Sequence, residues 1–114
     1  MMKEKRKYLL VESSASLAAI PNFEYRLQKE LLVIIGQPLF FKVNPNLHSI
    51  LGEHMFIISA TTEYFDYLIQ GISMINRIND TSIRFHTLKI SGTAKPLKNF
   101  AEKEQGLVQN KNTY

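Results

Sequence analysis

The sequence predicts an α+β fold in which a four-stranded antiparallel sheet packs with two main helices and a short C-terminal helix. Three observations predict it. Short apolar runs are interspersed with two longer segments whose apolar residues recur every three or four positions. Gly, Pro and Asn-Asp breaks separate these segments. The order that results is β-α-β-β-α-β.

The first predicted strand is the apolar run 7–12, which has a basic lead-in. A connection of small residues, 13–20, leads to Asn22, a candidate N-cap of the first helix. Gly36 and Pro38 end this helix, as a glycine at the C′ position and a downstream proline do. Its core-facing stripe consists of Phe23, Leu27, Leu31, Ile34 and Ile35.

The second strand is expected within residues 39–51, where Pro45 confines it to a sheet edge or divides it. Gly52 and Glu53 form a turn to the third strand, residues 54–60, so the two strands make a hairpin.

A threonine at 61 or 62 caps the second helix, which is expected to reach about residue 78. Gly71 is a weak point inside this helix. The fourth strand is residues 82–90, and Pro96 opens the short C-terminal helix.

Two right-handed crossovers around a hairpin give the split βαβ, or ferredoxin-like, sandwich. In that architecture the first and last strands lie side by side, and the first and third strands are central. Residues 1–104 are expected to form this single domain. Residues 105–114 are polar and are expected to form a flexible C-terminal tail.

The strands do not alternate between apolar and polar residues. Tyr8 and Leu10 point opposite to Leu9 and Val11 in the first strand, and the third strand behaves in the same way. Both faces of the sheet therefore need cover. We expect the C-terminal segment 97–100 to supply some of it and a protein partner to supply the rest.

The composition is that of an ordinary globular protein, with 45% hydrophobic and 21% charged residues. No apolar run approaches the ~20 residues that a bilayer-spanning helix needs. We therefore expect a cytoplasmic protein that does not contact membranes. The absence of cysteine excludes disulfides, thiolate zinc sites and thiol nucleophiles.

The charge is concentrated at the two ends of the chain. Residues 1–11 hold four basic residues and one acidic residue, residues 84–114 hold six and two, and the stretch between them is net acidic. Because the predicted topology joins the first and last strands, the two basic ends should form one surface for a polyanion. The simpler alternative is that these charges only keep the protein soluble.

The residues expected to bind RNA are cations at both ends and a turn whose amide groups can approach a phosphate. Tyr8 could stack on a base, but core packing is the preferred interpretation for it. The candidate RNA-binding residues are Lys5, Arg6, Lys7, Arg84, Lys89, Gly92, Thr93, Lys95 and Lys98.

No catalytic or metal site is predicted. Glu63 and Asp66 lie three residues apart on the first turn of the second helix, where anions favour the positive end of the helix dipole. His48, His54 and His86 show no spacing typical of metal ligands.

Two motifs carry a family resemblance. Residues 6–12 (RKYLLVE) resemble the opening strand of the archaeal and eukaryotic ribonuclease P protein component 2 family. Residues 83–95 (IRFHTLKISGTAK) resemble its last strand, its Ser-Gly-Thr turn and the basic helix that follows. The similarity covers about residues 5–100, although Asn44, Pro45 and Asn46 depart from the family, so contacts there are not carried over.

This resemblance implies a non-catalytic subunit of ribonuclease P, the ribonucleoprotein that removes 5′ leaders from precursor tRNA. The implied fold is like an RNA-recognition motif without its aromatic consensus, and residues 55–59 indeed lack the Gly-aromatic pattern. The catalytic RNA would hold Mg²⁺ and do the chemistry, while this chain, with no cofactor of its own, stabilises the active RNA fold. The implied partners are that RNA, precursor tRNA indirectly, the barrel-shaped protein component 3, and a second copy of the chain in a two-plus-two assembly.

Three alternatives share parts of this pattern. A ribosome-associated ferredoxin-like module would co-purify with ribosomal RNA. A regulatory domain would bind a small ligand independently of salt. A structural adaptor would not bind RNA at low salt.

Overall fold

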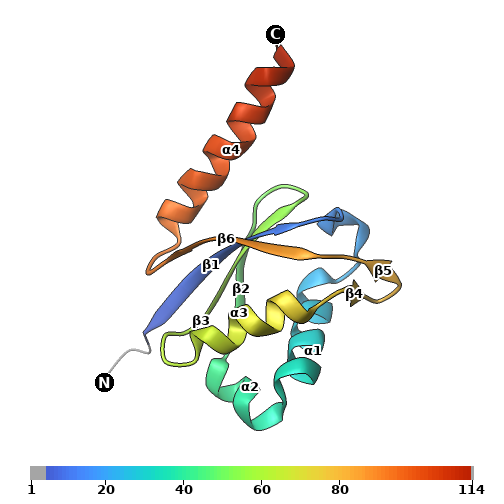
Figure 1. Cartoon of the computed structure of the whole chain (residues 1–114), viewed down its shortest axis with the longest axis vertical. Coiled ribbons are helices and arrows are strands. Elements are labelled where there is room, and N and C mark those ends of the chain that lie inside the picture. Colours follow the sequence, from blue (N-terminus) through green and yellow to red (C-terminus); the bar gives the residue numbers. More distant parts are fainter. Residues whose placement is uncertain (1–4, 114) are drawn as a thin grey trace.

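The computed structural model describes the backbone of residues 5–113 and the side chains of residues 5–104. It shows a four-stranded sheet, helices on both of its faces and a separate two-stranded hairpin (Figure 1). The elements are β1 (Arg6–Ser13), η1 (Leu17–Ala19), α1 (Phe23–Ile35), α2 (Gln37–Val43), β2 (Asn46–Ile50), β3 (Met55–Thr61), α3 (Phe65–Met74), β4 (Arg77–Ile78), β5 (Thr81–Ser82), β6 (Phe85–Ser91) and α4 (Lys95–Thr113).

The strand order in the main sheet is β2-β3-β1-β6, and each neighbouring pair is antiparallel. This confirms the predicted ferredoxin-like arrangement, with the first and third long strands at the centre and the first and last side by side. A register shift between Leu10 and Val11 marks a bulge in the β1–β6 ladder.

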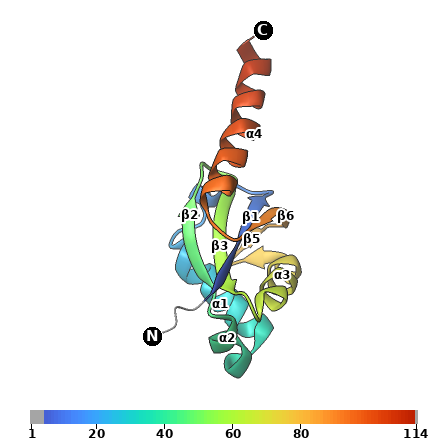
Figure 2. The same cartoon turned by 90° about the vertical axis from the view of Figure 1, so that its left-hand side faces the viewer.

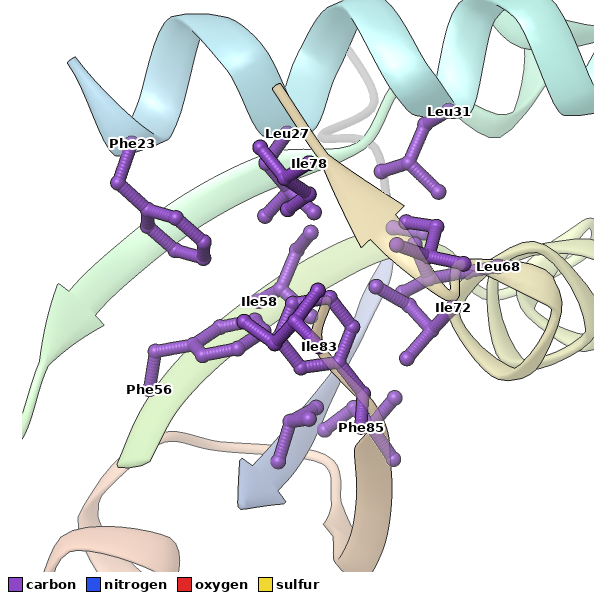
Figure 3. Close-up of a cluster of buried hydrophobic side chains, with 14 of the residues drawn as sticks. Phe23, Leu27, Leu31, Phe56, Ile58, Leu68, Ile72, Ile78, Ile83 and Phe85 are labelled. Carbon is purple, nitrogen blue, oxygen red and sulfur yellow. The ribbon is translucent and has the colours of Figure 1, made fainter. Parts of the chain in front are cut away.

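Helices α1 and α3 cover one face of the sheet with the main hydrophobic core (Figure 3). Three phenylalanine rings meet edge to face in this core. The ring centroids are 5.3 Å apart for Phe23 and Phe56, 5.3 Å for Phe56 and Phe85, and 6.3 Å for Phe23 and Phe85. Burying one such large apolar side chain stabilises the fold by roughly 1.5–3 kcal/mol. Leu27 and Leu31 of α1 are buried as predicted.

The opposite face of the sheet is covered in part by α4. Leu97 and Ala101, four residues apart and so on one side of the helix, are buried against Leu10, Met55 and Ile57. The expectation that both faces need cover, and that the C-terminal segment supplies some of it, is confirmed. Figure 2 shows α4 continuing beyond the sheet.

Asn22 precedes α1 as expected, but it does not cap the helix with its side chain. Its backbone is left-handed, with φ of 54°, and no side-chain hydrogen bond forms at this end. Asparagine tolerates this conformation better than most residues. Gly36 ends α1 with φ of 93°, as the sequence predicted.

The second strand lies within residues 39–51 as expected, but helix α2, which precedes it, is not predicted by the sequence. The actual helix contains Pro38 in its first turn and ends at the left-handed Asn44, and β2 begins only after Pro45. A short apolar run does not distinguish a helix from a strand, and proline suits the first turn of a helix as well as a strand end.

Helix α3 ends at Met74, four residues before the predicted end. The chain turns extended at Ile75 and forms the β4–β5 hairpin, in which Asn79 is left-handed. Ile78 of β4 and Ile83, which directly follows β5, are both buried. Because they are apolar, the sequence pattern predicted a longer second helix and a longer fourth strand.

Helix α4 spans 19 residues, which makes it about 28 Å long and longer than the short helix predicted. The polar composition suggested fraying, yet Lys, Glu and Gln are all good helix formers. The predicted flexibility of 105–114 falls where side chains are not described, so the tail and the division at residue 104 stay predictions.

Candidate nucleic-acid interface

The two basic segments meet where β1 pairs with β6. Tyr8 lies opposite Ser91, and Leu10 lies opposite Lys89. The start of β1 is therefore beside the turn that leads into α4 (Figure 1). This neighbourhood brings most of the predicted cations to one end of the sheet.

Lys5, Arg6 and Lys7 do not share one face, because side chains in an extended chain alternate between the two sides. Arg6 donates from Nε to Ser59 Oγ at 3.0 Å and from Nη2 to the Asn44 carbonyl at 2.6 Å. Lys7 lies over the ring of Phe65, with Nζ 5.9 Å from its centroid, so it belongs to the side of α3.

Arg84 lies away from the other cations. Its backbone exchanges hydrogen bonds with Ser14 at the far end of the β1–β6 pair. β6 runs from there to Ser91, roughly 23 Å away at the rise of a strand. The inclusion of Arg84 in one surface with Lys5, Arg6 and Lys7 is thus wrong, because antiparallel pairing puts the start of β6 beside the end of β1.

A cationic groove lies between β6 and α4. Its volume is about 240 Å³, and its walls are Lys89, Pro96, Asn99, Phe100 and Lys103. The Lys89 ammonium group is 5.0 Å from the centroid of the Phe100 ring, a cation–π contact that fixes the lysine at the groove. Lys89 faces the same side as Leu10, its partner in the β1–β6 ladder.

Lys103 is a functional candidate that the sequence reasoning missed. A helix turn brings residues 96, 99, 100 and 103 to one side, because they are spaced by three and four. This spacing was visible in the sequence and would have found Lys103 once α4 was predicted to extend past residue 100.

Lys95 and Lys98 are exposed on the first turns of α4. Burial of Leu97 between them anchors this part of the helix to the sheet. Together with Lys89 and Lys103 they give α4 and the adjoining part of β6 a set of four cations, which we call the α4 cations.

The Ser91-Gly92-Thr93 turn lacks the geometry of an anion-binding nest. A nest needs a left-handed residue, and Gly92 does not have a positive φ. The Thr93 amide already faces Ser91 Oγ at 3.3 Å. A Cβ atom on Gly92 would meet nothing within 4 Å, so glycine is not required there for space.

Tyr8 is half-buried beside α4 and packs edge to face with His48, with ring centroids 5.5 Å apart. This agrees with the preferred packing role. His48, His54 and His86 come from β2, the β2–β3 turn and β6. Among residues 5–104 no group of three or more His, Asp or Glu side chains could hold a metal ion.

Comparisons with known proteins identify the family of this chain. The model of the Rpp14/Pop5 family, a family of ribonuclease P protein components, matches residues 8–102. The chain belongs to the Rpp14/Pop5 family. The match spans β1 to the groove-lining part of α4, so it includes nearly all of the fold described above.

A solved structure agrees with the fold of this Rpp14/Pop5 protein. A chain in the cryo-EM structure of yeast ribonuclease MRP is similar with a TM-score of 0.62 and 12% identity, covering 96% of this chain and 98% of that one. A bacterial light-regulated adenylyl cyclase has a TM-score of 0.46 and 15% identity, covering 96% of this chain and 36% of that one. No curated protein sequence matches significantly. In the described part of the chain, no helix is both long and apolar enough to span a membrane.

Proposed function

We propose that this Rpp14/Pop5 protein is a non-catalytic subunit of ribonuclease P that binds the catalytic RNA and stabilises its active fold during removal of 5′ leaders from precursor tRNA. Family membership supports its place in such a ribonucleoprotein. The observation that carries the RNA-binding role is the set of α4 cations beside the cationic groove.

The mechanism is electrostatic. RNA helices that pack together repel each other, and Mg²⁺ ions normally offset that repulsion. The α4 cations are fixed on a helix that Leu97 and Ala101 anchor to the sheet, so they add positive charge at defined positions. Binding them to phosphates also releases condensed counterions.

Recognition on this surface is of the RNA backbone and shape. Lysine ammonium groups act as point charges for phosphate and carry little sequence information. The groove is about 240 Å³, which suits a phosphate with part of its sugar better than a whole base pair edge. The Mg²⁺ ions and the cleavage chemistry are assigned to the RNA.

Protein partners would cover the remaining apolar surface. Leu88 and Ile90 of β6 are exposed by 36% and 49%, and β6 is an edge strand of the sheet. We assign such surface to the barrel-shaped component 3 and to a second copy of the chain, in a two-plus-two assembly.

The experiment is reconstitution of the particle from the catalytic RNA, component 3 and this chain. Lys95→Ala combined with Lys98→Ala should raise the Mg²⁺ concentration needed for half-maximal leader removal by about two-fold or more, because RNA compaction loses two fixed charges. A control variant with Lys29→Ala and Arg77→Ala removes two exposed charges on α1 and β4 and should leave the Mg²⁺ requirement unchanged.

An unchanged Mg²⁺ requirement in the Lys95 and Lys98 variant would count against the proposal. Selective co-purification of the chain with ribosomal RNA, in place of the tRNA-processing RNA, would favour a ribosome-associated module.

A further inference from the structure

A second pocket, which shares no lining residue with the groove beside α4, has walls suited to a single unpaired nucleotide. It opens where the start of β1, the end of α2 and the β3–α3 connection meet, and its volume is about 530 Å³. Figures 1 and 2 place α2 and the free end of α4 at opposite ends of the molecule. The lining residues of this α2 pocket are Lys5, Phe41, Lys42, Thr61, Thr62, Glu63 and Tyr64.

Two aromatic rings line the α2 pocket. Phe41 is 67% exposed, and its ring rests edge to face on the half-buried Phe40 with centroids 5.9 Å apart. Tyr64 is half-buried and packs beside Tyr67 at 6.2 Å. An exposed ring held in place by a second ring is a preformed surface for stacking, since little side-chain freedom is lost when a base binds.

Two lysines lie at the same pocket. The Lys42 ammonium group is 6.0 Å from the centroid of the Tyr64 ring, and Lys5, the residue before β1, also lines the pocket. The backbone around them is tied together, because Thr61 Oγ1 donates to the Lys42 carbonyl at 2.8 Å and the Thr62 amide donates to the Lys5 carbonyl at 2.9 Å. The cations are therefore carried by a fixed frame.

Glu63 adds a carboxylate to the lining of the α2 pocket. Its carboxylate accepts hydrogen bonds only, so it repels a phosphate and favours the amino or imino group of a base. The α2 pocket thus combines stacking rings, phosphate-binding cations and an acceptor for a base edge, which is the combination found in grooves for single-stranded nucleic acid.

We propose that the α2 pocket takes one unpaired nucleotide of the RNA, with its base against Phe41 and Tyr64 and its flanking phosphates at Lys5 and Lys42. This inference rests on the proposed function, because both take RNA as the partner. It adds a second contact, in which aromatic rings stack on a base, to the phosphate contacts of the α4 cations. A base inside an A-form duplex is stacked and paired, so only an unpaired residue can enter.

The test measures binding of the full-length chain to an eight-nucleotide oligouridylate and to a short RNA duplex by fluorescence anisotropy over a series of salt concentrations. Phe41→Ala should weaken oligouridylate binding by roughly ten-fold, the usual effect of losing one base-stacking ring, and leave duplex binding unchanged. Its salt dependence should equal that of the wild type, because no charge is removed. Lys42→Ala should reduce the slope of log K against log salt by about 0.7, one phosphate of a single strand.

The chain offers a matched control on α1. Tyr25 is 60% exposed and carries Lys29 over its ring, with Nζ 5.1 Å from the centroid. The pocket beside Lys29 is smaller, about 300 Å³, and no aromatic ring is among its lining residues, which are Arg26, Lys29, Glu30, Val33 and Asn79. Tyr25→Ala and Lys29→Ala should bind both RNAs as the wild type does. Thermal unfolding of all four variants checks that each folds, which is expected because these side chains are on the surface.

Wild-type binding of oligouridylate that Phe41→Ala leaves unchanged would overturn the nucleotide site while leaving the proposed function intact. An equal loss in Tyr25→Ala would overturn it too, since the effect would not belong to the α2 pocket. A wild-type chain that binds neither RNA would overturn both this inference and the proposed function.

Discussion

Gly71 lies in α3 at the point where that helix packs on α1. A Cβ atom there would be 3.1 Å from Leu31 Cδ2 and 3.3 Å from two carbon atoms of Ile35. The residue that looked like a weak point in the helix therefore allows the two helices to approach. The steric fit, more than helix propensity, explains a glycine at this position.

Gly71→Val should lower the free energy of unfolding by about 1–3 kcal/mol, because a branched side chain overfills the α1–α3 contact. Urea unfolding followed by circular dichroism measures this. Gly92→Ala is the matched comparison and should change stability by less than about 0.5 kcal/mol, since space is open there and φ is not positive. A Gly71→Val protein as stable as the wild type would show that α1 and α3 do not pack this closely.

At the scale of elements, α4 depends on very few buried side chains for its position. Leu97 is fully buried and Ala101 nearly so, while Phe100 is only partly covered. Because the α4 cations are carried by this helix, its anchorage to the sheet links packing to RNA binding.

Leu97→Ala should lower the free energy of unfolding by about 2–5 kcal/mol if α4 stays docked on the sheet, and by less if α4 detaches. In both cases the amide protons of Leu10 and Ile57, which lie beneath α4 in the wild type, should exchange with solvent faster than in the wild type, as measured by hydrogen exchange. Lys98→Ala, one residue further along and exposed, should leave the exchange unchanged. Equal protection in the Leu97→Ala and wild-type proteins would mean that α4 is not held by this contact.

The sequence predicted the strand order and the helix-side core well, because the periodicity of α1 and the flanking Gly36 and Pro38 are strong local signals. It failed at α2 and at the β4–β5 hairpin, whose two-residue strands are too short to show any periodicity. Ile78 in β4 and Ile83 directly after β5 nevertheless contribute to the core. Such segments are set by tertiary packing, which overrides local preference.

The candidate site was predictable only in part, because the sequence predicts which strands are neighbours but not where each side chain points. Adjacency of β1 and β6 follows from topology, so the end of β6 lies beside the start of β1, as predicted, and Lys89 pairs with Leu10. The direction of each side chain depends on register and on alternation along the strand, which separates Arg6 from Lys7 and removes Arg84 from the group. The α2 pocket could not be seen in the sequence, because it joins three segments that only the fold brings together.

At the scale of the whole molecule, the chain carries a net charge of +4, and its charges are unevenly distributed. The molecule measures 51 × 37 × 20 Å, and its long axis runs from α2 to the free end of α4 (Figure 1). The α4 cations lie on β6 and the first turns of α4, and the α2 pocket lies between the start of β1, α2 and the β3–α3 connection. The acidic residues of the middle of the chain, such as Glu24 and Asp66, lie on α1 and α3, which cover the other face of the sheet.

The salt dependence of binding to the catalytic RNA tests most directly the central claim that the α4 cations contact its phosphates. Wild-type binding to structured RNA should give a slope of log K against log salt of roughly −4 to −5, as expected for about six phosphate contacts. Replacing Lys89, Lys95, Lys98 and Lys103 with alanine should make that slope shallower by about 3 to 4. A quadruple variant with the slope of the wild type would contradict the claim.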